Sequence, residues 1–102
     1  MVGLRRVIAF VGELDLATAP MLADAVDRAA GDGMAEIWVD LRPTSFMDVI
    51  GVHCLVDGRA RTAGRRFAVI CNAAPLRRLL ALTGADAHLD LFRDSAAANR
   101  AA

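Results

Sequence analysis

The stretch Phe46-Met47-Asp48-Val49-Ile50-Gly51 lies where we expect a buried strand to end and a helix to begin. Asp48 suits the N-cap of that helix, because its carboxylate can accept hydrogen bonds from the first backbone N–H groups. Those N–H groups also point at whatever docks on the junction. The stretch therefore indicates both how the chain is organised and where its functional surface lies.

Apolar runs and breaking residues on either side of this junction predict the remaining elements. The first helix is expected to begin at Thr18, with its hydroxyl as N-cap and Pro20 in the first turn, and to end near Gly31 and Gly33. Further predicted helices run from Val49 to Ala63, from Pro75 to Thr83 and from Asp94 to Ala102. Strands are predicted at Val7–Val11, Ile37–Val39 and Phe67–Cys71, with a short edge strand at Ala87–Leu91, whereas Arg42-Pro43-Thr44 reads as a break.

The resulting order is β-α-β-α-β-α-β-α, which is typical of an α/β fold built from parallel crossovers. We expect one domain covering residues 1–102, with a mixed, mostly parallel sheet of four to five strands and about four helices. Loops rather than strands are expected around Glu13 and Asp15.

The composition of the chain argues against several classes of function. Hydrophobic residues make up 56% of the chain, and 12 Lys+Arg balance 12 Asp+Glu. This balance argues against a nucleic-acid groove, and no apolar run is long enough to insert in a membrane. We expect a cytoplasmic protein without cofactor or metal, in which Cys54 and Cys71 are free thiols. No nucleophile–base pair or phosphate-binding glycine loop supports an enzyme.

Three blocks of the sequence together resemble the STAS domain family, and in particular its bacterial anti-sigma-factor antagonists. The first block is Gly12-Glu13-Leu14-Asp15-Leu16-Ala17-Thr18-Ala19-Pro20, and the second combines Val39-Asp40-Leu41 with Phe46-Met47-Asp48 and Gly51. The third runs from Pro75 to Gly84. The resemblance implies the STAS fold and a partner-switching role: the antagonist binds an anti-sigma factor that is itself a serine kinase, and so frees the sigma factor.

In this family the kinase modifies a Ser or Thr directly after the motif's Asp, and the added charge breaks the complex. That position is Val49 here, and Ile50 follows it, so neither residue can accept a phosphate. We therefore expect the binding role without the usual switch. A helical wheel places Ile50 and Cys54 on the outward side of the helix, as an apolar contact patch. The expected partner-binding residues are Glu13, Asp15, Thr18, Ser45, Met47, Asp48, Val49, Ile50, Gly51 and Cys54.

Several alternatives stay open. Some small STAS proteins are accessory subunits of ABC-type membrane transporters, which is the second functional hypothesis. A small-ligand or nucleotide sensor is the third functional hypothesis. Separately, a redox switch at the cysteines could replace phosphorylation as the input signal. Family members usually begin with an extra strand, which residues 1–5 supply only in part, and two copies could pair as a homodimer at the sheet edge left open.

Overall fold

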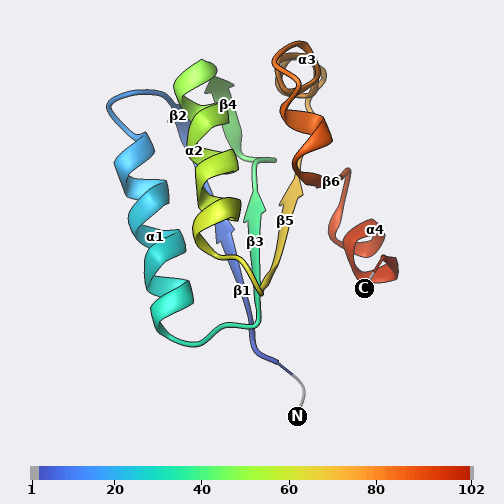
Figure 1. Cartoon of the computed structure of the whole chain (residues 1–102). Helices are drawn as coiled ribbons and strands as arrows, with labels where there is room; N and C mark the ends of the chain where they lie inside the picture. The colour runs from blue at the N-terminus through green and yellow to red at the C-terminus, as the bar shows by residue number, and fades with distance from the viewer. Residues whose placement is uncertain (1–2, 102) are drawn as a thin grey trace.

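The computed structural model describes residues 3–101 and shows strands alternating with helices (Figure 1). The strands are β1 (Arg5–Ala9), β2 (Gly12–Leu14), β3 (Glu36–Asp40), β4 (Thr44–Met47), β5 (Arg66–Ile70) and β6 (Asp90–Phe92). The helices are α1 (Ala19–Gly31), α2 (Val49–Arg61), α3 (Ala74–Leu82) and α4 (Ser95–Arg100), with a 3-10 turn, η1, at Ala85–Ala87. The predicted fold class is confirmed. The edge strand begins later than expected, because η1 occupies the start of the predicted segment.

Two sheets share the strands. The main sheet has the order β1-β3-β5-β6, and all of its pairings are parallel, with Val7 beside Trp38 and Trp38 beside Ala68. A second parallel sheet pairs β2 with β4. The strand pairs among the described residues are thus all parallel, rather than mixed.

Strands β2 and β4 were missed from the sequence, where we predicted a loop at Glu13 and a break at Arg42–Thr44. The predicted break does interrupt the strand, but only between Asp40, where β3 ends, and Thr44, where β4 begins. Gly12 adopts φ 96°, and its N–H donates to the carbonyl oxygen of Pro43 at 3.2 Å. The two neighbouring strand segments bend at this point. Beyond the bend, the pairing of β1 with β3 continues as the pairing of β2 with β4. The bend is what separates the second sheet from the first.

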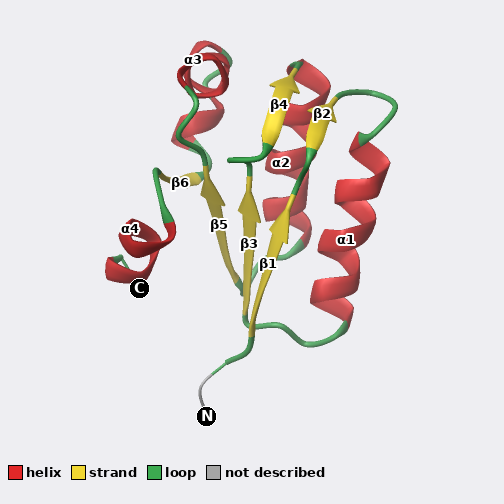
Figure 2. Cartoon of the chain, turned by 180° about the vertical axis from the view of Figure 1, so that it is seen from behind, coloured by secondary structure: helices red, strands yellow, loops and turns green. Residues whose placement is uncertain are grey.

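Helices α1 and α2 cover one face of the main sheet, as the view from behind shows (Figure 2). Leu22 and Val26 of α1 and Leu55 of α2 pack there against strand residues such as Ile37 and Phe67, all of them buried. Each such side chain contributes about 1.5–3 kcal/mol by leaving water. This layer positions the start of α2.

The opposite face is smaller and is covered by α4. Trp38, Ala68 and Ile70 are buried there together with Ala98 of α4. The guanidinium of Arg5 lies 3.8 Å from the centroid of the Trp38 ring, which is the geometry of a cation–π contact. A polar lid of this kind lets the tryptophan be buried although few apolar residues cover it.

Asp40 ends β3 beside this face and is held by Arg42. Its carboxylate accepts hydrogen bonds from Arg42 Nε at 3.0 Å and Arg42 Nη2 at 2.9 Å. Burial raises the pKa of Asp40, but the bonds from Arg42 outweigh it and hold this pKa below its ordinary value. The pair therefore stabilises the turn that leads into β4.

The predicted ends of the chain are only partly described. Gly3 and Leu4 precede β1 and lie outside any strand. The rest of the partial first strand, residues 1 and 2, and the last residue of the final predicted helix, Ala102, lie outside the described residues. Within residues 3–101, no helix combines the length and the apolar character needed to span a membrane.

Candidate functional site

The pairing of β2 with β4 brings the two predicted binding segments together. Glu13 lies opposite Phe46 and Leu14 opposite Met47. The N–H of Asp48 then donates to the carbonyl oxygen of Leu14 at 3.3 Å. The segment around Glu13 and the start of α2 thus form one continuous surface at the carboxyl end of the strands (Figure 1).

Asp48 is the N-cap of α2, as predicted. Its Oδ1 accepts hydrogen bonds from the backbone N–H groups of Ile50 at 3.0 Å and Gly51 at 3.2 Å. A cap of this kind contributes about 1 kcal/mol to helix stability. The Asp48 carboxylate therefore already satisfies these two backbone donors at the start of α2.

Gly51 lets β2 approach α2 closely. A Cβ atom at this position would lie 2.9 Å from the carbonyl oxygen of Leu14 and 2.7 Å from Cγ of Met47. Gly51 and Met47 are both buried. These two predicted binding residues therefore lie beneath the surface, where Gly51 leaves room for β2 to pack on α2.

The prediction that the Thr18 hydroxyl caps α1 is wrong. Thr18 does precede α1, but its side chain makes no capping bond to the helix. Its hydroxyl instead donates to the carbonyl oxygen of Glu13 at 2.7 Å and accepts from the N–H of Asp15 at 3.0 Å. Oδ1 of Asp15 accepts in turn from the N–H of Ala17 at 3.0 Å. Asp15 and Thr18 close a tight turn on themselves, because short polar side chains bond readily to nearby backbone.

Exposed apolar side chains surround the start of α2. We name Leu16, Phe46, Val49 and Ile50 the apolar rim; their exposed fractions are 74%, 50%, 44% and 37%. Val49 and Ile50 were predicted as contact residues. Leu16 and Phe46 were missed as contact residues, although both lie within the blocks that resemble the family. An apolar cluster of this kind is typical of a protein-binding surface.

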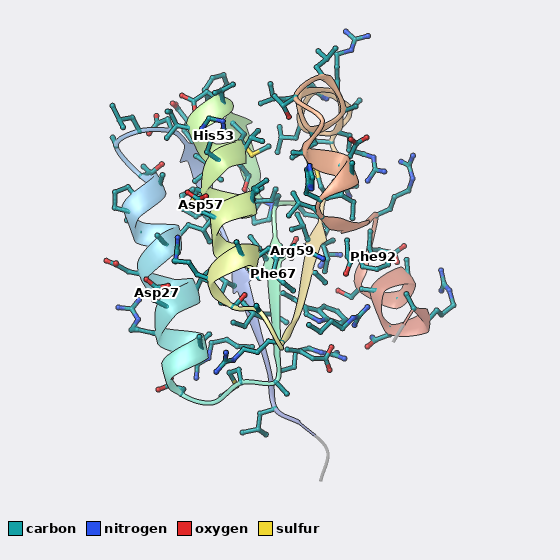
Figure 3. The ribbon with its side chains drawn as sticks, viewed as in Figure 1. Asp27, His53, Asp57, Arg59, Phe67 and Phe92 are labelled. Carbon is teal, nitrogen blue, oxygen red and sulfur yellow. The ribbon has the colours of Figure 1, made fainter. Side chains whose placement is uncertain are left out.

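A groove of about 300 Å³ between α1 and α2 continues from the rim. Ile50 and Cys54 line it from α2, and Ala19 and Ala23 line it from α1. Arg61 of α2 closes the far end through an ion pair of 3.2 Å with Asp27. Figure 3 shows Asp27 on α1 and Asp57 on α2 along the adjoining sides of the two helices.

Cys54 does not lie on the outward side of α2, as the helical wheel had suggested. It is half-buried in the groove, where its Sγ donates to the carbonyl oxygen of Ala19 at 3.5 Å. Helix α1 packs closer to α2 than a wheel can show. Burial raises the pKa of the Cys54 thiol and also that of Cys71, which is fully buried. Both cysteines are free, so a neutral, weakly reactive thiol is the state that this structure favours.

The hydroxyl groups near the junction are poorly placed for modification. Thr44 is buried, and its Oγ1 donates to the carbonyl oxygen of Phe10 at 2.7 Å. Ser45 is exposed, but it lies within β4, before Asp48. Directly after Asp48, Val49 presents only methyl groups. No group of three or more His, Cys, Asp or Glu residues in the described part of the chain could hold a metal ion.

Comparisons with known proteins agree on one family. The STAS domain model matches residues 2–98. The anti-sigma-F factor antagonist RsfB of Mycobacterium tuberculosis is 28% identical over 87 residues, which is 84% of this chain and 71% of that protein. The crystal structure of an anti-sigma factor antagonist from Mycobacterium paratuberculosis superposes with a TM-score of 0.88 and 26% identity, covering 95% of this chain and 84% of that one. The unphosphorylated anti-sigma factor antagonist SpoIIAA shares the fold, with a TM-score of 0.75 at 22% identity over 98% of this chain and 90% of that one.

Proposed function

The chain belongs to the STAS domain family, and we propose that it acts as an anti-sigma-factor antagonist that binds an anti-sigma factor of the serine-kinase type. The observation that carries the proposal is the pairing of β2 with β4, which joins the two family motifs into one surface bordered by the apolar rim. The similarity to RsfB and to the mycobacterial antagonist structure supports it. Such a protein acts by binding and carries out no chemical step, and its place of action is the cytoplasm, where transcription takes place.

We propose that Glu13, Val49 and Ile50 contact the partner, with Ser45 at the border of the interface. Glu13 is exposed and supplies the negative charge of the surface, and the two apolar residues supply its dry part. Asp15, Thr18, Met47, Asp48 and Gly51 shape the backbone, and Cys54 lines the groove beside it. Interfaces of this kind derive most of their affinity from a few desolvated apolar anchors.

The proposal includes constitutive binding, because the position that the family phosphorylates is Val49. A phosphate at this place would bring a charge of about −1.5 to −2 into the interface, next to Asp48. Valine cannot receive it. The kinase activity of the partner therefore leaves this antagonist bound.

Binding is tested with the purified chain and the anti-sigma kinases of the source organism, by calorimetry. The chain should bind at least one of them. Val49→Glu should weaken that binding about tenfold or more, since an unpaired charge in a dry contact costs more than about 1.4 kcal/mol. Val7→Glu is the matched control, because Val7 is a similarly exposed valine on β1, away from α2. Failure to bind any kinase would sink the proposal, and capture by a transporter subunit instead would favour the alternative function.

Loss of the switch is tested by incubating the chain with its kinase and ATP. Mass spectrometry should find residues 44–51 unmodified, and Val49→Ser should restore labelling at position 49. Labelling of Ser45 in the unaltered chain would contradict the proposal of constitutive binding while leaving the binding role intact.

A further inference from the structure

We propose that the outer edge of β1 accepts an extended segment of another protein as an additional strand. The site consists of the free backbone of β1 and the hollow between β1 and α1. The site includes none of the apolar rim, although Glu13 borders both surfaces. The proposal does not rest on the proposed function.

The backbone of β1 offers a regular row of unpaired groups. β1 is the last strand of the main sheet, with β3 on its inner side. The carbonyl oxygen of Leu4 accepts from Glu36 N, and the N–H of Phe10 donates to the carbonyl oxygen of Asp40. Alternate residues therefore turn their backbone N–H and C=O groups toward β3. The residues between them along β1, which are Arg5, Val7 and Ala9, turn theirs outward.

The outward N–H and C=O groups of Arg5, Val7 and Ala9 pair with no other strand among residues 3–101. Spacing two residues apart is the repeat of an extended chain, so a further strand can satisfy all of them at once. Unpaired edges of this kind are sites of strand addition. The hydrogen-bonding pattern thus specifies an extended backbone rather than a helix or a small molecule.

A hollow of about 610 Å³ lies beside this edge. Ile8 of β1 and Phe10, just after β1, line one side of it, and Met21, Leu22 and Ala25 line it from α1. Both views of the fold place α1 on the β1 side of the sheet (Figures 1 and 2). A strand added to β1 would therefore direct every second side chain into an apolar space that α1 covers.

The exposed apolar residues around the hollow fit the same occupant. Met21 is 65% exposed and Val11 78%, both line the hollow, and an added strand would cover them. Glu13 lines one end of the hollow and is exposed. The occupant that fits is an extended segment with apolar side chains at alternate positions and a basic residue at the end nearest Glu13.

An isolated segment fits this edge better than the β1 strand of a second copy does. Two-fold pairing of β1 with its own copy would place both α1 helices on the same face of the joined sheet. Because α1 already stands over the hollow, the two helices would compete for one space. The homodimer that an open edge suggests is therefore the less favourable occupant.

The probe is the acetylated, amidated peptide Lys-Thr-Val-Thr-Val-Thr-Val-Lys, titrated into isotope-labelled protein and followed by amide NMR shifts. Saturable shifts should appear at Arg5, Val7 and Ala9 and along the first half of α1. The same peptide with proline in place of its central valine should not bind, because proline breaks the hydrogen-bond ladder. Absence of saturable shifts on β1, or shifts centred on the apolar rim instead, would overturn the proposal.

Two variants test the geometry. Ala9→Pro removes an outward N–H without removing a bond to β3, and it should weaken peptide binding about tenfold, whereas Ala9→Ser should bind as the unaltered chain does. Met21→Glu puts a charge at the hollow on an exposed position, where folding tolerates it, and should weaken binding similarly. Circular dichroism checks that each variant is folded. Unchanged affinity in Met21→Glu would refute the role of the hollow even if Ala9→Pro failed to fold.

Discussion

Replacing Gly51 by alanine tests how closely β2 packs on α2. The added Cβ would lie 2.9 Å from both the carbonyl oxygen and Cγ of Leu14, and 2.7 Å from Cγ of Met47. The methionine side chain can rotate away, but the Leu14 oxygen belongs to the backbone and accepts a bond from Asp48 N. Relieving the overlap therefore requires β2 to move. Overpacking of this kind costs about 1–3 kcal/mol, and alanine returns up to about 1 kcal/mol through helix propensity.

We expect the free energy of unfolding to fall by about 1–2 kcal/mol in Gly51→Ala. In a domain of this size that lowers Tm by roughly 4–8 °C for each kcal/mol. Urea and thermal denaturation, followed by circular dichroism, measure both quantities.

Gly58→Ala is the matched control, because Gly58 is also buried in α2. Its added Cβ would lie 3.4 Å from Cζ of Phe67 and 3.7 Å from Cγ1 of Val26, at the edge of ordinary contact. With no backbone atom in the way, this variant should gain about 0.5–1 kcal/mol. The two substitutions should thus have opposite signs. If Gly51→Ala were as stable as Gly58→Ala, the close packing of β2 on α2 would be refuted.

Three further predictions concern single interactions. Asp48→Ala should lose about 1 kcal/mol of stability in urea denaturation, and Asp48→Asn should lose much less, because asparagine caps helices equally well; equal losses would argue against the cap. The lowered pKa of Asp40 gives stability that is present above the ordinary Asp value of about 4 and is lost as pH falls through the folded-state value. Denaturation at neutral and acid pH should therefore show a smaller acid loss in Arg42→Met, and an unchanged pH profile would contradict the pairing. In mass-spectrometric labelling with iodoacetamide at neutral pH, Cys54 should react more slowly than glutathione and Cys71 more slowly still, because burial raises both pKa values; a fast Cys54 would revive the redox switch.

The sequence predicts the main sheet and the helices because their signals are local and strong. The apolar run around Trp38 marks β3, and Gly64, with φ 89°, follows the end of α2. Asp48 predicts its own cap, since the residue type and the following helical pattern are adjacent. Such features depend on neighbours in the chain, which one sequence contains.

Strands β2 and β4 were missed because they gain their stability from each other. Each is short, and Gly12 and Pro43 beside them read as breaks. Their pairing is a long-range contact, which no local sequence pattern encodes. The predicted exposure of Cys54 was wrong for the same reason, because a helical wheel contains no information on where the neighbouring helix α1 packs. Thr18 was misread because its turn with Asp15 competes with the helix cap for the same hydroxyl.

The pairing of β2 with β4 also constrains when the proposed partner-binding surface can form during folding. The whole of α1 and β3 lies between the two strands in the chain, so their contact closes a long loop and carries its entropy cost. Contacts between distant segments form slowly compared with local helices. A chain still emerging from the ribosome, complete through α1 but not yet through β4, possesses one motif without the other. On the proposed mode of binding, a partner can therefore recognise the chain only after β4 has paired with β2.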